Sequence, residues 1–190
     1  MNNLDFLNFY NKIPHNSPGK SDKGTVHDYI AGWYTQEFSP KRYEPLNILE
    51  IGAARGNSMI LFRDYFENSK ITTIDNLSQH DTNTVKFIKD IEGVDLLIDD
   101  AYTTSCVSRF EDGSFDYIID DGPHTLESQL YSVEHYLSKV KIGGKLIIED
   151  VKGQYLSNKP FDRFGLPYEI VDLRANKGRF DDILVVFTKN

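Results

Sequence analysis

Short runs of branched apolar residues alternate along the chain with segments whose apolar residues recur every three or four positions. Runs of this kind, typical of strands buried on both faces, are found at residues 47–51, 70–75, 94–99, 115–120 and 143–150. The segments between them predict helices at residues 57–67, 82–91 and 125–140, and a short helix at 103–110. Strands and helices therefore alternate through most of the chain.

The two ends of the chain depart from this alternation. Residues 168–174 and 183–189 predict a closing hairpin across the turn GRFDD. Residues 22–38 predict a helix opened by a polar cap, and Pro40 and Pro45 bracket its exit. Residues 1–20, with scattered aromatic residues and asparagines, predict an irregular arm or cap.

Alternating strands and helices predict right-handed crossovers, and hence a doubly wound α/β fold with a mostly parallel sheet. We expect seven strands, of which the last pair forms a C-terminal antiparallel hairpin. We also expect a single domain over residues 1–190, with 1–45 as an N-terminal arm and capping helix and 46–190 as the core. Ligands of such sheets bind beyond the carboxyl ends of the strands.

Composition narrows the classes of partner. The net charge of −8 argues against a nucleic-acid partner, although a local basic groove stays open. A single cysteine, Cys106, excludes an intramolecular disulfide and suits a reducing cytosol. The N-terminus lacks the pattern of a signal peptide, and no apolar stretch approaches the ~20 residues that span a bilayer. We therefore expect a cytoplasmic protein without a membrane partner, and we leave its oligomeric state open, a homo-oligomer included.

The first predicted strand leads into the glycine-containing turn LEIGAARGNS, residues 49–58. Gly52 and Gly56 let the backbone pass close to a ligand. A dinucleotide fingerprint would need G-x-G-x-x-G, but Ala54 stands at its second glycine, and no P-loop lysine follows. The turn E-x-G-x-x-x-G thus suits a nucleoside that carries no pyrophosphate, or it is an ordinary glycine-rich turn.

Acidic residues end the next two strands. Asp75 ends the second, where a carboxylate can accept both ribose hydroxyls. Asp99, Asp100, Ala101 and Tyr102 end the third and suit an adenine edge and face. The alternative for Asp75 is an unrelated surface carboxylate.

This combination resembles the class I S-adenosylmethionine-dependent methyltransferases over roughly residues 46–190. In that family the E-x-G-x-x-x-G loop lies against the methionine portion of the cofactor, and the acid of the second strand holds the ribose. The resemblance implies a Rossmann-like fold and the following cofactor-binding residues: Glu50, Gly52, Ala53, Gly56, Asp75, Asn76, Asp100, Ala101 and Asp120.

The ends of the fourth and fifth strands are more acidic still. Asp120 and Asp121 end one, and Glu149 and Asp150 end the other. Carboxylates crowded together raise one another's pKa unless a cation neutralises them, and oxygen ligands suit Mg²⁺ or Ca²⁺. His124 is within reach as a general base. The alternatives are a helix-capping role for one of the two aspartates, a solvated strand end for Glu149 and Asp150, and a structural role for His124.

The stretches IIDDGPHTLESQ, IIEDV and SDKGTVHDYI resemble a narrower group, the Mg²⁺-dependent sugar O-methyltransferases of macrolide tailoring. That resemblance implies that Asp121, Glu149 and Asp150 bind the metal and that His124 is the base. Pro123 stands where a small residue such as serine is expected, and the N-terminal region is too short for an auxiliary domain. Residues 151–167 are predicted to be a loop in place of a full helix. These differences bear on the substrate more than on the chemistry.

The resulting hypothesis is methyl transfer from S-adenosylmethionine to a hydroxyl of a sugar or sugar-bearing small molecule, with Mg²⁺. The alternatives are a catechol- or phenol-type O-methyltransferase and a non-catalytic S-adenosylmethionine-binding protein; the acidic strand ends argue against the latter. Lys23, His27 and Tyr29 either close over a ligand or belong to an ordinary surface helix. Cys106 has little support as a nucleophile.

Overall fold

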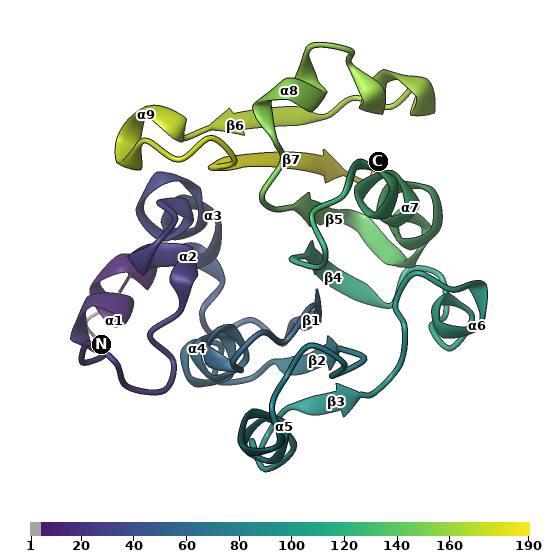
Figure 1. Ribbon diagram of the computed structural model, residues 1–190. Coiled ribbons are helices and arrows are strands. Elements are labelled where there is room, and N and C mark those ends of the chain that lie inside the picture. Colours follow the sequence, from purple (N-terminus) through teal and green to yellow (C-terminus); the bar gives the residue numbers. More distant parts are fainter. Residues whose placement is uncertain (1–4) are drawn as a thin grey trace.

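A seven-stranded sheet forms the centre of the described part of the chain, residues 5–190, in this computed structural model (Figure 1). Its strands are β1 (Asn47–Ile51), β2 (Lys70–Ile74), β3 (Asp95–Leu97), β4 (Phe115–Asp120), β5 (Val140–Ile148), β6 (Glu169–Asp172) and β7 (Ile183–Thr188). They are ordered β3-β2-β1-β4-β5-β7-β6, and β7 runs antiparallel to both β5 and β6. The predicted fold class is confirmed, with the antiparallel hairpin at the end of the chain.

Helices lie on both faces of this sheet (Figure 1). The α-helices are α1 (Phe6–Lys12), α2 (Asp22–Thr25), α3 (Thr35–Phe38), α4 (Asn57–Tyr65), α5 (Thr82–Lys89), α6 (Thr104–Val107), α7 (Leu126–Tyr136), α8 (Gly153–Leu156) and α9 (Arg174–Lys177). Short turns of other helix types are η1 (Ile30–Tyr34), η2 (Ser39–Lys41), η3 (Leu137–Lys139) and η4 (Pro160–Phe164). The four helices predicted between the strands are all present, each somewhat shorter than predicted.

The N-terminal segment differs from its prediction. A helix, α1, forms where an irregular arm was expected, because the Asp5 side chain caps it and Phe6 and Tyr10 are buried one turn apart. The single helix predicted over residues 22–38 is instead α2, the π-helical turn η1 and α3, with residues 26–29 outside them. Residues 151–167 contain only the short helices α8 and η4, in keeping with the loop that was predicted.

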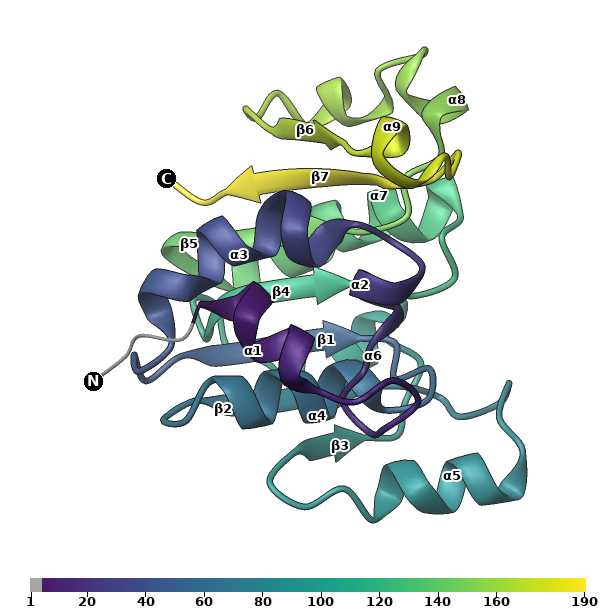
Figure 2. The same cartoon turned by 90° about the vertical axis from the view of Figure 1, so that its left-hand side faces the viewer.

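Two large apolar clusters cover the faces of the sheet, and a third, smaller cluster includes Met59 and Ile88. On one face, aromatic residues of α1, α3 and α4 pack together; the Phe6 ring lies 4.6 Å from Tyr65 and 5.5 Å from Phe38. On the other face, α7 and the segment around Phe161 cover β4, β5 and β7. Figure 2 shows α1, α2 and α3 lying across the sheet, with α2 beside the carboxyl ends of the central strands. The N-terminal segment is therefore part of the core and reaches the edge where ligands of this fold bind.

Candidate functional site

A cavity of about 710 Å³ opens at the carboxyl ends of β1 to β5. This volume is within the range of small-molecule sites, ~300–1,000 Å³. Of the predicted site residues, its wall contains Gly52, Asp75, Asn76, Asp100, Ala101, Asp121, His124 and Asp150. Those that are not on its wall are Glu50, Ala53, Gly56, Asp120 and Glu149. Residues of the first set can touch a ligand directly, whereas those of the second set lie behind or beside the cavity wall.

The turn after β1 is shaped by close backbone approach. Gly52 has a φ of +97°, and a Cβ atom there would lie 2.2 Å from the carbonyl oxygen of Asp121. Only glycine fits a position with both features. Gly56, with φ of +75°, caps the start of α4. Glu50 is fully buried and accepts a hydrogen bond from the Ser58 hydroxyl at 2.8 Å. The turn therefore needs its two glycines for geometry, while Glu50 is buried and is not on the cavity wall.

Asp75 ties the first two strands together. One of its oxygens accepts a hydrogen bond from the Ala53 amide at 2.8 Å, and the other accepts one from the Leu77 amide at 2.6 Å. His80 also lies near, with its Nε2 atom 3.5 Å from Oδ2. Asp75 and His80 both line the cavity. Binding of a ribose by Asp75 stays a prediction. The hydrogen bond from the Ala53 amide links the Asp75 side chain to the turn after β1.

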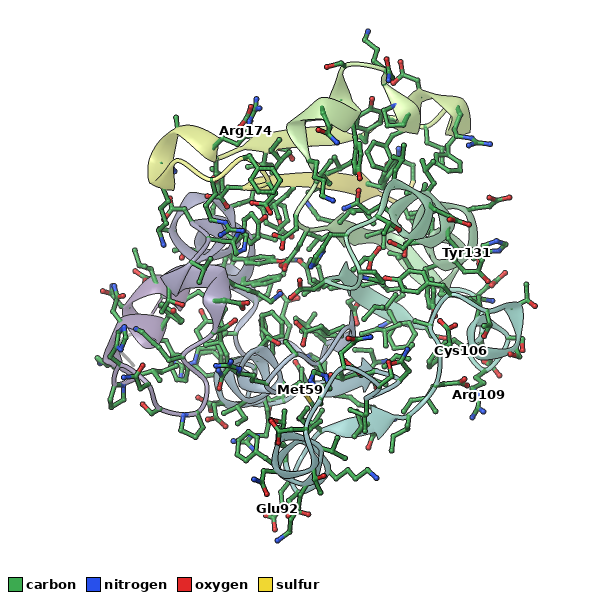
Figure 3. The ribbon with its side chains drawn as sticks, viewed as in Figure 1. Met59, Glu92, Cys106, Arg109, Tyr131 and Arg174 are labelled. Carbon is green, nitrogen blue, oxygen red and sulfur yellow. The ribbon has the colours of Figure 1, made fainter. Side chains whose placement is uncertain are left out.

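The wall beyond β3 is formed by Asp99, Asp100, Ala101 and Tyr102, with Tyr131 of α7 on the same side of the molecule (Figure 3). Asp120 lies behind this wall and is 2% exposed. Its Oδ1 atom accepts a hydrogen bond of 2.6 Å from the Tyr102 hydroxyl. Burial raises the pKa of the Asp120 carboxyl, and the hydrogen bond with Tyr102 opposes that shift.

Asp121, His124 and Asp150 come together on the cavity wall. The Nε2 atom of His124 lies 3.8 Å from Asp121 Oδ1 and 3.5 Å from Asp150 Oδ2. Each residue offers one ligand atom, and these atoms all lie within 4.8 Å of one another. His124 and Asp150 have φ values of 54° and 53°, in the left-handed region that side chains rarely adopt. Strained backbone of this kind is concentrated at functional sites.

The structure excludes two of the alternatives left open for these residues. Thr125 caps α7, its hydroxyl accepting the Ser128 amide at 3.1 Å, so neither Asp120 nor Asp121 serves as that cap. Glu149 and Asp150 are 1% and 9% exposed, so this pair does not form a solvated strand end.

Lys23 enters the acidic cluster from the N-terminal segment. Its Nζ atom lies 2.5 Å from Glu149 Oε2, 2.6 Å from Asp121 Oδ2 and 3.3 Å from Glu50 Oε1, and the residue is 1% exposed. Burial lowers the pKa of the ammonium, but the three carboxylates outweigh it and hold that pKa well above its usual range. Lys23 is thus neither on a surface helix nor open to the cavity. In the sequence, only the stretch SDKGTVHDYI pointed to this lysine.

Residues 27–34 supply further partners of the carboxylates at the end of β5. The Tyr29 hydroxyl donates to Asp150 Oδ1 at 2.6 Å, and the Tyr34 hydroxyl donates to Glu149 Oε1. The His27 ring stacks on Tyr29 with 4.8 Å between centroids, and its Nδ1 atom lies 3.4 Å from Asp150 Oδ1. All three N-terminal side chains are buried. They hold the carboxylates of Glu149 and Asp150 in fixed orientations.

The donor set on the cavity wall fits a divalent cation. Two carboxylate oxygens, Asp121 Oδ1 and Asp150 Oδ2, face the same space as His124 Nε2. Two carboxylates with room for water are typical of Mg²⁺. The buried His27 is not on the cavity wall, and its Nδ1 atom lies 3.4 Å from both Asp150 Oδ1 and Asp182 Oδ1. The chemistry of these residues is therefore that expected of a magnesium or manganese site.

Comparisons with known proteins give the site a context. The profile of a family described as a methyltransferase domain matches residues 49–151. A curated relative, the 8-demethyl-8-(2-methoxy-α-L-rhamnosyl)-tetracenomycin-C 3′-O-methyltransferase of Streptomyces olivaceus, is 29% identical over 142 residues. That match covers 71% of this chain and 35% of the relative, so the chain corresponds to about a third of the relative's length.

Two solved structures show the same fold. The MycE methyltransferase of the mycinamycin biosynthetic pathway, in complex with Mg and SAH, is 18% identical with a TM-score of 0.67. The similarity covers 98% of this chain and 54% of the MycE chain. Fibrillarin of Aeropyrum pernix, with natively bound S-adenosyl-L-methionine, is 14% identical with a TM-score of 0.59, over 78% of this chain and 68% of that one. Among residues 5–190, no helix has both the length and the apolar character that crossing a membrane requires.

Proposed function

The chain belongs to this methyltransferase-domain family, whose members here are class I S-adenosylmethionine-dependent methyltransferases, and from that premise we propose a more specific activity. The protein transfers a methyl group from S-adenosylmethionine to a hydroxyl of a sugar or sugar-bearing small molecule, assisted by Mg²⁺. The names of the Streptomyces relative and of MycE, which occurs in complex with Mg, support the acceptor class and the metal.

One observation supports this proposal most. The group Asp121, His124 and Asp150 lies on the wall of the same cavity as the Gly52 turn and Asp75. A cofactor held by the turn after β1 and by β2 would thus share one space with a base and with metal-ligating oxygens. Methyl transfer needs such an arrangement, because the acceptor oxygen must be in line with the methyl carbon when it loses its proton.

The chain's own residues divide the work as follows. Gly52, Asp75 and the backbone after β3 bind and orient the cofactor, whose sulfonium supplies an activated methyl carbon. The acceptor oxygen forms a bond to that carbon as the carbon–sulfur bond breaks and its electron pair returns to sulfur. His124 Nε2 accepts the hydroxyl proton, which an imidazole does well near neutral pH.

Asp121 and Asp150 hold the metal in this proposal. A divalent ion held there would polarise the acceptor hydroxyl and make its proton easier to remove. The role of Glu149 as a further ligand stays a prediction. Its two carboxylate oxygens contact Lys23 and Tyr34 in this structure.

Calorimetric titration of S-adenosylmethionine, with and without Mg²⁺, tests the cofactor part. We expect saturable binding that Asp75→Ala weakens strongly, because the variant loses both the ribose acceptor and the contact with the Ala53 amide. Absence of saturable binding to the wild type would refute the proposal.

A methyl-transfer assay with a panel of glycosides and catechols tests the acceptor. His124→Ala should abolish turnover of the preferred acceptor while leaving cofactor binding nearly intact. Unchanged turnover in this variant would exclude His124 as the base, and a preference for catechols would favour the phenolic alternative.

A further inference from the structure

A second hollow lies at the amino ends of β1, β2 and β4, where Asn47, Lys70 and Phe115 begin these strands and line it. Its volume is about 760 Å³. Figure 2 shows the arrowheads of these strands pointing toward the end of the sheet where α2 lies, so the hollow is at the opposite end from the catalytic cavity. The apolar side chains that line it are Val94, Leu96, Leu97, Phe110 and Phe115.

The hollow is open because little of the chain covers this part of the sheet. A doubly wound sheet is normally covered by helices on both faces. Between β3 and β4, however, the described chain has only α6, a single turn (Figure 1). Leu97 and Phe110 are therefore only half-buried, at the margin of the apolar cluster that contains Phe115. Apolar surface left open in this way is stabilised when a partner covers it.

An exposed isoleucine stands beside the hollow. The register between β4 and β5 shifts after Phe115, so residues 141–144 bulge out of the ladder next to the wall of the hollow. Ile142 in this bulge is 82% exposed, more than any other large apolar side chain of residues 5–190. The Gly143 amide donates a hydrogen bond of 2.7 Å to the Lys189 carbonyl and holds the bulge in place. A defined backbone thus keeps an apolar side chain in solvent.

The charges of the bulge and the hollow are opposite. Residues 90–116, which supply most of the wall of the hollow, contain eight acidic residues and one basic residue. Residues 139–144 contain two lysines and no acidic residue. Glu111 is exposed on the wall of the hollow, and the Lys141 side chain in the bulge is 39% exposed. The bulge therefore complements the hollow in both shape and charge.

We propose that this surface binds a second copy of the chain, with Ile142 of each molecule seated in the hollow of the other. Because the bulge and the hollow lie side by side, a two-fold axis between them allows both contacts to form at once and closes a dimer. Lys141 of each copy then faces Glu111 of the other, which favours this orientation. A different partner with a basic, apolar tip would fill the hollow but leave Ile142 exposed, so a second copy accounts for both features.

Sedimentation equilibrium of the full chain tests the proposal. We expect a mass near twice 21.8 kDa at high concentration, falling to that of one chain on dilution. Ile142→Asp places a charge in an apolar contact and should raise the Kd of the dimer by about tenfold or more. Ile170→Asp makes the same change on β6, at a residue that is 45% exposed, and should leave the Kd unchanged. A wild type that is monomeric at every concentration, or equal effects of the two variants, would overturn the inference.

A charge exchange tests the orientation of the two copies. Lys141→Glu and Glu111→Lys each place like charges opposite one another, so each variant alone should dimerise about tenfold more weakly than the wild type. An equimolar mixture should form a dimer again, because the substituted bulge of one variant meets the substituted hollow of the other and the native groups meet in the second contact. A mixture that associates no better than the separate variants would overturn the inference.

The dimer can fail without the proposed function failing. None of the four substituted residues lines the catalytic cavity, so S-adenosylmethionine should bind equally well to the wild type and to every variant. This titration also verifies that each variant is folded before its mass is measured. Normal cofactor binding by a chain that is always monomeric would overturn the dimer and leave the methyltransferase assignment intact.

Discussion

Replacing Lys23 by methionine should destabilise the protein far more than the same change at an exposed lysine such as Lys70. The ammonium is 1% exposed and has three carboxylates within 3.3 Å. Removing one partner of a buried ion pair leaves the other charge unpaired and costs ~3–5 kcal/mol. For a domain of this length, each kcal/mol lowers Tm by roughly 2–4 °C, so a fall on the order of 10 °C is expected.

Partial protonation of the cluster reduces this cost at low pH. Burial raises the pKa of the Glu149 carboxyl well above its usual range, and Lys23 opposes that rise. Without the ammonium, Glu149 takes up a proton more readily, which relieves part of the repulsion. The loss of stability in Lys23→Met should therefore be smaller in mildly acidic buffer than in mildly alkaline buffer.

Urea unfolding measures the effect. Trp33, the chain's single tryptophan, is buried in the N-terminal cluster, so its fluorescence reports the unfolding of that segment. Lys70→Met is the matched control, because its ion pair with Asp95, at 3.0 Å, is about two-thirds exposed on both sides. Exposed pairs contribute only ~0–1 kcal/mol. A loss in Lys23→Met no larger than that in Lys70→Met would refute the view that the ammonium neutralises a buried cluster.

Two further changes test the turn after β1 and its glutamate. Gly52→Ala should weaken S-adenosylmethionine binding by about tenfold or more, because left-handed strain of ~1–2 kcal/mol is joined by a clash of the new Cβ with a backbone oxygen at 2.2 Å. Gly113→Ala, also at positive φ but with nothing within 4 Å, should leave calorimetric binding unchanged, and equal losses in the two variants would contradict the steric argument. Burial raises the pKa of Glu50 from 4.5 to about 7, so the folded state binds this proton more tightly than the unfolded state does. The stability from this group is fully present below pH 4.5 and is lost as the pH rises through about 7. Urea titration across that window measures the free energy of unfolding. In Glu50→Gln it should fall less steeply with rising pH than in the wild type. A steeper fall would refute the raised pKa of Glu50.

The sequence by itself determined the sheet and the position of the site. Runs such as residues 115–120 are apolar on both faces, and only a strand covered on both sides satisfies that pattern. Because parallel strands place their carboxyl ends at one edge, the polar residues after β1 to β5 had to gather there. Gly52 and Asp121, both read as site residues, do lie side by side.

Only the tertiary structure decided which partners the carboxylates of the cluster have. Lys23 meets Glu149 across 126 positions of sequence, and Tyr34 meets it across 115. A lysine in a polar segment has the same local pattern whether it is solvated or buried, so periodicity could not distinguish the two. The helix at Phe6–Lys12 was missed for a related reason, since two turns carry too short a period to detect. The contacts of this helix, like those of Lys23, form because the sheet brings distant segments of the chain together. A charged side chain buried there finds partners that its neighbours in sequence cannot supply.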